Sequence, residues 1–264
     1  MAKTAPDIDH AATIAALRTI ARRAGAVILE HYHGVRSARM KADDSPVTAA
    51  DEAAEAVILP ALAALLPGVP IIAEEAAALS GLPSDEAFAQ QRFWLVDPLD
   101  GTKEFLSGNG EFTVNIALIE AGRPLLGVVH APTLDTCYAG GPDGATKQHG
   151  SEPPKPIAAR RQPADGAIVL ASRSHGSGQQ LDAFLANEKV LEHRTAGSSL
   201  KFCLVAEGIA DLYPRFGRTM EWDTAAAHAV LAAAGGQVTT LDGKELAYGK
   251  AGFVHPHFVA RGRP

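Results

Sequence analysis

Two aspartates stand three residues apart at the end of an apolar run, in the segment Trp94-Leu95-Val96-Asp97-Pro98-Leu99-Asp100-Gly101-Thr102. Pro98 donates no backbone N–H and pushes Asp97 toward an extended conformation, so a strand is expected to end at Asp97. The following turn would leave Asp97, the Leu99 carbonyl and Asp100 free to converge, and such hard oxygen ligands suit Mg²⁺ or Mn²⁺ rather than zinc. The residues after Gly101 are predicted to open a helix, whose unpaired N–H groups suit an anionic oxygen. The segment therefore indicates a place for metal ions beside a phosphate.

Three further carboxylates stand near the ends of predicted elements. Glu74 follows a predicted strand, Asp51 lies near the start of a predicted helix, and Asp223 precedes the last long helix. Asp97 follows an apolar run and Asp223 follows Trp222, so both are expected beside buried groups. An unpaired carboxylate is costly there, and a divalent cation is its simplest partner. Taken alone, Asp51 and Asp223 could each instead be a helix cap.

The N-terminal half reads as helices followed by an antiparallel sheet. Apolar spacing predicts helices over residues 8–33 and 48–66, and Thr48-Ala49-Ala50-Asp51 opens the second as a capping box. Short turns join the runs that follow, which favours antiparallel pairing. The strands are expected at residues 69–73, 93–96, 112–119, 125–131 and 136–139.

The composition changes at residues 140–156, the part of the chain richest in Pro and Gly. This predicts a boundary between an α+β metal-binding domain at residues 1–150 and an α/β substrate-specificity domain at residues 151–264. Beyond the boundary, strands alternate with helices, which predicts parallel strands covered by helices. The strands are expected at 168–172 and 190–193, and the helices at 179–186, 199–207 and 224–234.

Composition bounds the class of protein. The chain has 264 residues, 47% of them hydrophobic, and a net charge of −6, which offers no general attraction to nucleic acid polymers or anionic membranes. Cys137 and Cys203 lie in hydrophobic stretches and are expected to be free core residues. Neither a signal peptide nor a transmembrane segment is visible, so a cytoplasmic location is expected. Peripheral membrane contact and the choice between monomer and homodimer stay open.

Taken together, the motifs resemble a known family. Three signatures, Glu74-Glu75, the Asp97–Thr102 segment and Trp222-Asp223, are similar to those of the inositol monophosphatase superfamily of lithium-sensitive, metal-dependent phosphatases. Further segments resemble one branch of it, the CysQ-type 3'(2'),5'-bisphosphate nucleotidases. They are residues 109–119, Ser172-Arg173-Ser174-His175, residues 197–203 and residues 212–217. The resemblance runs from about Leu17 to the C-terminus and implies a layered α/β/α/β/α fold.

The resemblance also implies a set of metal ligands for two or three Mg²⁺ ions. Glu74, Asp97 and the Leu99 carbonyl would hold one ion, and Asp97, Asp100 and Asp223 a second. A phosphate dianion would be repelled by so many carboxylates, so cations must reverse the local field before an anionic substrate binds. Of these ligand residues, Glu74, Leu99, Asp100 and Asp223 are also expected to contact the substrate.

Water activation and phosphate binding are implied at neighbouring positions. Asp51 and Thr102, with Glu74, would form the catalytic group that polarises the attacking water. The Gly101 and Thr102 amides would receive the phosphate. For Glu75 two alternatives stay open, an acid that orients a water or a loop, or a charged neighbour without a role.

The C-terminal half supplies candidates for recognising a nucleotide. Ser198, Lys201 and Arg215 could hold a 5'-phosphate through charge-assisted hydrogen bonds. His175 resembles the residue that stacks on adenine in relatives. The remaining histidines, His255 among them, show no metal-ligand spacing and are expected to be exposed.

The implied function is Mg²⁺-dependent release of the 3'-phosphate from adenosine 3',5'-bisphosphate, a small-molecule nucleotide, to give AMP. Its sulfated form, 3'-phosphoadenylyl sulfate, is an expected second substrate. An inositol monophosphatase is the alternative within the superfamily. A sensor that binds nucleotide or metal without turnover is the alternative from another class, although binding alone needs no water-activating pair.

Overall fold

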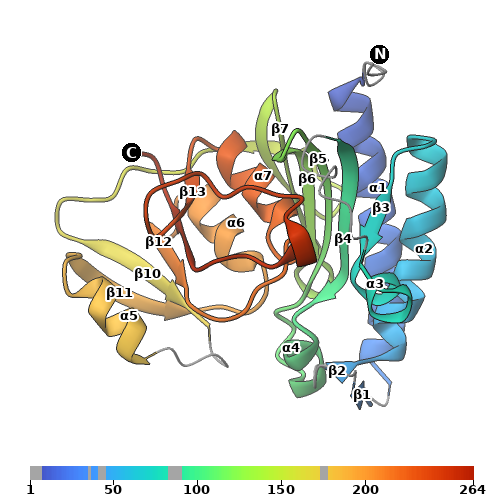
Figure 1. The fold of residues 1–264 in the computed structure, drawn as a ribbon, viewed down its shortest axis with the longest axis horizontal. Coiled ribbons are helices and arrows are strands. Elements are labelled where there is room, and N and C mark those ends of the chain that lie inside the picture. The colour runs from blue at the N-terminus through green and yellow to red at the C-terminus, as the bar shows by residue number, and fades with distance from the viewer. Residues whose placement is uncertain (1–7, 35–36, 41–45, 83–90, 173–177) are drawn as a thin grey trace.

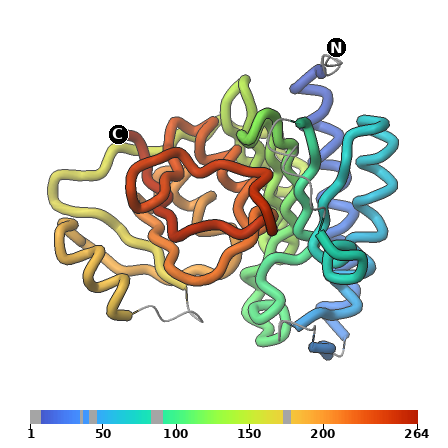
Figure 2. Tube along the Cα trace, in the orientation of Figure 1, coloured from blue at the N-terminus to red at the C-terminus, as the bar shows by residue number. Residues whose placement is uncertain are grey.

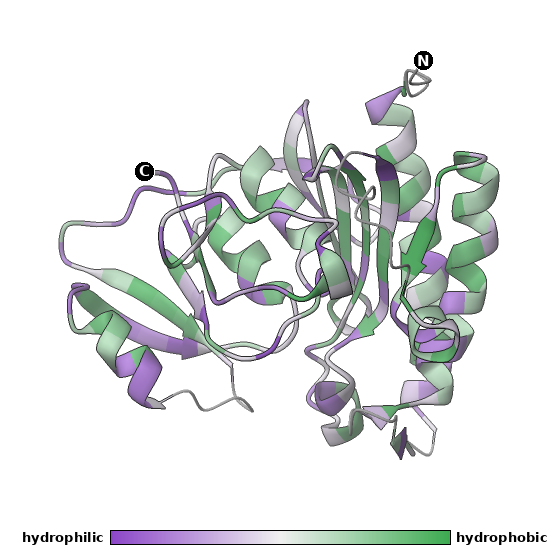
Figure 3. Ribbon diagram, viewed as in Figure 1, coloured by the Kyte–Doolittle hydropathy of each residue, from purple (hydrophilic) through white to green (hydrophobic). Residues whose placement is uncertain are grey.

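The computed structural model describes residues 8–34, 37–40, 46–82, 91–172 and 178–264. Helices and sheets alternate in five layers (Figure 1). In order, the layers are the helices α1 (His10–Tyr32) and α2 (Ala49–Leu65), a seven-stranded sheet, the helices α6 (Leu200–Ala206) and α7 (Ala225–Ala233), a five-stranded sheet, and α5 (Gly178–Leu185). Hydrophobic residues, green in Figure 3, are concentrated in the strands and in the helices beside them. The expected α/β/α/β/α arrangement is confirmed.

Helices α1 and α2 pack on each other and cover one face of the larger sheet. The predicted capping box of α2 is present. The Thr48 side chain accepts from the Asp51 N–H, and the Asp51 carboxylate accepts from the Thr48 N–H. Asp51 is only 2% exposed, so the cap also fixes a buried carboxylate at the first turn of α2.

The larger sheet has the order β3-β4-β5-β6-β7-β8-β9. Its first strand lies parallel to the second, and the other neighbours are antiparallel, which confirms the predicted antiparallel sheet for most of its width. The last two strands of this sheet, β8 and β9, were not predicted. The bounds are β3 (Ile71–Ala73), β4 (Arg92–Asp100), β5 (Thr113–Glu120), β6 (Arg123–Ala131), β7 (Thr136–Gly141), β8 (Gly144–His149) and β9 (Lys155–Ile157). A separate pair, β1 (Arg39–Met40) and β2 (Pro46–Val47), lies near α4.

Strand β4 continues past Asp97, so the prediction that it ends there is wrong. A bulge between Asp97 and Asp100 interrupts its pairing with β5, and pairing resumes with Asp100 opposite Thr113. Pro98 lies in this unpaired part, where the ladder needs no N–H donor. The predicted helix after Gly101 is present as α4 (Thr102–Ser107).

Helix α7 lies directly against the larger sheet because two glycines remove side chains from the contact. A Cβ on Gly127 of β6 would stand 2.2 Å from the Ala226 carbonyl oxygen. A Cβ on Gly140 of β7 would stand 2.5 Å from the Val230 Cα. This close approach brings the segment before α7, which carries Asp223, up to the sheet that carries Asp97.

The smaller sheet has the order β11-β10-β12-β14-β13. Strands β10 and β11 are parallel, as predicted, and β12 also lies parallel to β10, whereas β14 runs antiparallel to both of its neighbours. The last three strands by sequence were not predicted. The bounds are β10 (Ala167–Ala171), β11 (Val190–Thr195), β12 (Leu212–Arg215), β13 (Gln237–Thr240) and β14 (Phe258–Arg261).

Several other expectations meet the structure here. Both cysteines are buried and free, as predicted. His255 is 5% exposed, so the expectation that it is solvent-exposed is wrong. In the described part of the chain, no helix has both the length and the apolar character needed to span a bilayer. The division into domains at residue 150 stays a prediction, and the larger sheet takes its last strand, β9, from residues beyond that position.

Candidate functional site

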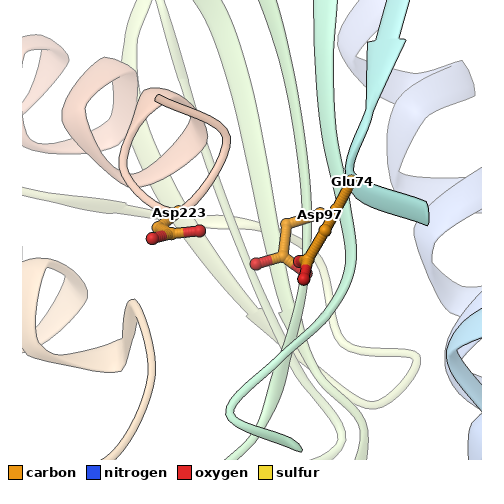
Figure 4. Close-up of side chains that lie close together, drawn as sticks. All are labelled: Glu74, Asp97 and Asp223. Carbon is orange, nitrogen blue, oxygen red and sulfur yellow. The ribbon is translucent and has the colours of Figure 1, made fainter. Parts of the chain in front are cut away.

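Three carboxylates from separate parts of the chain meet at the edge between the larger sheet and α7. Glu74 is the first residue of α3 (Glu74–Ser80), Asp97 lies in β4, and Asp223 precedes α7. One oxygen from each lies within 4.8 Å of the others, and their side chains point toward one another (Figure 4). Two oxygens that share one cation at about 2 Å stand up to about 4 Å apart, so a separation of at most 4.8 Å is close to the spacing that shared coordination needs.

Burial makes this cluster costly without a cation. The pKa of Asp97 is raised well above its usual value, first by desolvation and then by the charges of Glu74, Asp100 and Asp223. Burial also raises the pKa of Asp223, with Asp100 and Glu74 adding to the effect. Hard oxygen donors that repel one another in a buried place are the donor set that a divalent cation stabilises.

Asp100 lines the same cavity, and hydrogen bonds from residues outside the acidic cluster hold its side chain. Its Oδ2 accepts hydrogen bonds from the Ser199 N–H at 2.5 Å and from Asn115 Nδ2 at 3.3 Å. Burial raises its pKa to about 6, although the nearby Lys201 ammonium lowers it. Sequence reasoning missed Asn115 and Ser199, which are also bonded to each other at 2.7 Å.

The predicted water-activating pair lies together beside the cluster. The Thr102 hydroxyl is 3.3 Å from Asp51 Oδ1, and 3.4 Å from the Leu99 carbonyl oxygen. Asp51 Oδ2 accepts from the Thr48 N–H at 2.8 Å, which holds the carboxylate in one orientation. The Leu99 N–H donates to Asp97 Oδ1 at 3.0 Å, so the bulge in β4 also orients Asp97.

A cavity of about 390 Å³ opens over these groups. Gly101 lines it with a left-handed φ of 94°, and a Cβ there would lie 3.2 Å from the Glu111 carbonyl oxygen. Because a side chain would be strained in this backbone and crowded, glycine is required at this turn. The predicted residues that line the cavity are Glu74, Asp97, Leu99, Asp100, Gly101, Thr102, Ser198, Lys201, Arg215 and Asp223.

The predicted basic residues line the cavity from two elements, Lys201 from α6 and Arg215 from β12. Lys201 is 3% exposed, and its ammonium donates to the carbonyl oxygens of Ser198 at 2.7 Å and Ala196 at 3.2 Å. Burial lowers its pKa to about 8. Arg215 donates to the Thr219 hydroxyl at 2.9 Å and to Ser172 at 3.2 Å. His175 lies outside the described residues.

Glu75 is not among the residues that line this cavity. It is 6% exposed, and its backbone N–H donates to Glu55 Oε2 at 3.0 Å. Glu55 of α2 thereby caps the first turn of α3, which has no cap from its own residues. Sequence reasoning missed Glu55, although its spacing of four from Asp51 places both carboxylates on one face of α2.

Comparison with known proteins assigns the family. The model of the inositol monophosphatase family matches residues 9–261. The chain belongs to this inositol monophosphatase family. The 3'(2'),5'-bisphosphate nucleotidase CysQ of Escherichia coli K12 is 48% identical over 246 residues, which are 90% of this chain and 95% of that protein. CysQ of Haemophilus influenzae is 33% identical, covering 92% and 90%. The predicted resemblance to the CysQ-type branch is confirmed.

Solved structures of the family agree in fold. CysQ from Bacteroides thetaiotaomicron superposes with a TM-score of 0.80 at 35% identity, covering 96% of this chain and 98% of that one. Inositol monophosphatase from Anabaena superposes with a TM-score of 0.73 at 25% identity, covering 97% and 92%. The five-layer arrangement is therefore the family's fold.

Proposed function

We propose that this chain is a Mg²⁺-dependent phosphatase that removes the 3'-phosphate of adenosine 3',5'-bisphosphate to give AMP, and that it also acts on 3'-phosphoadenylyl sulfate. The observation that carries the proposal is one cavity lined both by the Glu74, Asp97 and Asp223 carboxylates and by the basic side chains of Lys201 and Arg215. The identity of 48% to a 3'(2'),5'-bisphosphate nucleotidase supports the choice of substrate.

The metal would be held by the oxygens of the acidic cluster. Glu74, Asp97 and the Leu99 carbonyl form one proposed set of ligands, and Asp97, Asp100 and Asp223 form the second, for two or three ions. When bound, Mg²⁺ supplies positive charge for the phosphate and acidifies water. Because Asp97 belongs to both sets, its carboxylate is the group on which the proposed site depends most.

The chain's own groups would direct the attack on phosphorus. Asp51, oriented by Thr48, accepts through Thr102 the proton that the attacking water loses. The new bond joins the water oxygen to phosphorus, and the bond to the ribose O3' breaks. O3' takes a proton from solvent and leaves as the hydroxyl of AMP, and Asp51 then returns its proton to solvent. The Gly101 and Thr102 amides receive the phosphate oxygens at the start of α4.

The basic residues that line the cavity would recognise the second phosphate of the substrate. Arg215 would donate to the 5'-phosphate, with Ser198 and Lys201 beside it. The stacking of His175 on adenine stays a prediction, since this residue lies outside the described part of the chain. A monophosphate that lacks the 5' group would leave these residues unused.

Arg215→Ala is expected to raise KM for adenosine 3',5'-bisphosphate by about 10-fold or more, because one charge-assisted hydrogen bond is worth about 1.5–3 kcal/mol. KM for adenosine 3'-monophosphate should change little. Lys201→Ala is expected to act in the same direction. Steady-state kinetics on both esters checks this, with the exposed Arg123→Ala as the control. An equal loss on both esters would remove these residues from the specificity site.

Stabilisation by Mg²⁺ is expected to grow with pH. The folded protein raises the pKa of Asp97, Asp100 and Asp223 above the ordinary 3.8, to about 6 for Asp100. Their favourable contribution to metal-free stability is therefore present below pH 4 and is lost as the pH rises through the raised values. The Tm increase caused by Mg²⁺ should be greater at pH 8 than at pH 5, by on the order of 5 °C. Equal increases would contradict the account.

A phosphate-release assay in Mg²⁺ tests the proposed function directly. The expected result is a clear preference in kcat/KM for adenosine 3',5'-bisphosphate over inositol 1-phosphate. Preference for the inositol ester would favour an inositol monophosphatase, and no release from any ester would favour a sensor without turnover. The cytoplasmic location stays a prediction, and the choice between monomer and homodimer stays open.

A further inference from the structure

The loop between β13 and β14 is fastened to the segment that carries Asp223. In Figure 2 this loop, coloured red, crosses in front of α6 and α7. Met220 forms an isolated β-bridge with Val254, and the His255 N–H donates to the Thr219 carbonyl oxygen at 2.9 Å. The segment before α7 is therefore fixed from outside the cavity.

Glu221 makes the largest share of these contacts. Its side chain is fully buried and accepts from the Gly249 N–H at 2.6 Å and the Lys250 N–H at 3.1 Å. The Lys250 ammonium forms an ion pair with the same carboxylate. The backbone of Glu221 also takes part, since its N–H donates to the Phe253 carbonyl oxygen at 2.9 Å. We call Glu221, Gly249 and Lys250 the clasp.

A second set of contacts holds the residue on the other side of Asp223. The Thr224 hydroxyl lies 2.8 Å from His255 Nε2 and 3.1 Å from the Tyr248 hydroxyl. His228 Nδ1 lies 3.0 Å from that same tyrosine hydroxyl. All four side chains are buried, so none of these bonds competes with bulk water. Asp223 thus lies between two anchors in one loop.

Asp223 needs such anchoring more than its partners do. Asp97 and Glu74 lie on and directly after two paired strands, β4 and β3, whose ladder sets their separation. Asp223 comes from another layer and faces two like charges. Its Oδ2 accepts from the Met220 N–H at 2.8 Å, so its orientation depends on the turn that Glu221 fixes.

From this geometry we infer that Glu221 is a positioning residue, which sets the affinity of the acidic cluster for divalent cations by holding Asp223 against Glu74 and Asp97. The inference rests on the metal site of the proposed function. Glu221 itself does not line the cavity. Its effect would pass through Asp223, as do the effects of residues that orient metal ligands in other proteins.

The test compares Glu221→Gln with the parent protein by calorimetric titration of Mg²⁺, without substrate. Gln keeps the size of the side chain but loses the charge and one strong acceptor. The dissociation constant for Mg²⁺ should rise about 10-fold or more. In phosphate-release assays the Mg²⁺ concentration for half-maximal rate should rise likewise, while kcat is largely recovered at saturating Mg²⁺.

Two further variants keep the test decisive. Glu245→Gln is the matched control, since Glu245 is exposed in the same part of the chain and pairs with Arg123. Its Mg²⁺ affinity should equal that of the parent. Lys250→Met removes the cation of the clasp, together with its contacts to the Ala247 carbonyl oxygen and His255 Nδ1, and serves if Glu221→Gln does not fold. It should weaken Mg²⁺ binding in the same direction by a smaller factor.

The outcomes separate this inference from the proposed substrate. Folded variants of Glu221 or Lys250 with parental Mg²⁺ affinity would overturn the positioning role, as would a parent protein that binds no Mg²⁺. A parent that binds Mg²⁺ but does not hydrolyse adenosine 3',5'-bisphosphate would overturn the proposed substrate alone. Weaker Mg²⁺ binding in the variants would then still support the role of Glu221.

Discussion

Asp97→Asn should lower kcat/KM for phosphate release from adenosine 3',5'-bisphosphate by about 10³-fold or more, equivalent to about 4 kcal/mol or more of transition-state stabilisation. Asn has the size of Asp but carries no charge, and Asp97 is assigned to both sets of metal ligands. Its buried carboxylate stands within 4.8 Å of the Glu74 and Asp223 oxygens. Assays at saturating Mg²⁺ with purified variant and parent check the loss.

Loss of folding can be distinguished from loss of chemistry in this variant. Burial and neighbouring charges raise the pKa of Asp97, so removing its charge relieves repulsion in the metal-free protein. The metal-free variant should therefore unfold at a Tm no lower than that of the parent at pH 8, and gain less from Mg²⁺. Asp143→Asn, in the exposed turn between β7 and β8, is the matched control. Substantial turnover by folded Asp97→Asn would contradict the metal assignment.

Thr102→Val is expected to lower kcat by about 10²–10³-fold, within the range that a positioned acid or base contributes. Val keeps the shape of Thr and removes the hydroxyl that stands 3.3 Å from Asp51 Oδ1. The carboxylates of the acidic cluster are untouched, so the Mg²⁺ affinity should stay at the parental value. Rapid-quench or steady-state measurement of kcat, with Mg²⁺ titration alongside, checks the split.

Thr102→Ser provides the matched control for the hydroxyl. It keeps the donor and acceptor and should retain most of kcat. If Val and Ser lose activity equally, the methyl group and the packing of α4 matter rather than the hydroxyl. A fall in Mg²⁺ affinity for Thr102→Val would likewise count against a role in water activation.

The sequence predicted the carboxylates that line the cavity because their chemistry is local. Asp97 and Asp100 share one segment, and their spacing beside a buried strand restricts what they can do. The same local reasoning erred at Pro98, because a bulge removes the need for an N–H donor and lets the strand continue to Asp100. Local rules restrict the backbone conformation of a residue such as Pro98. Whether the strand continues beyond that residue depends on how the neighbouring strand pairs on each side of it.

Contacts across the sequence were beyond local reasoning. The Ser199 N–H that holds Asp100 comes from 99 residues away, and the Gly249 N–H that holds Glu221 from 28 residues away. The strands that were not predicted are β8, β9 and β12–β14, and their pairing depends on neighbours in the folded sheets. His255 was expected at the surface, because no sequence pattern shows that it would form a buried hydrogen bond with Thr224.

The central claim is that carboxylates from three distant segments bind divalent cations in one cavity. A crystal structure grown with Mn²⁺, with anomalous scattering recorded at the manganese edge, tests it most directly. The account predicts an anomalous peak about 2 Å from an Asp97 carboxylate oxygen, with Glu74 and Asp223 oxygens completing the contacts. No peak in this cavity at saturating Mn²⁺ would contradict it.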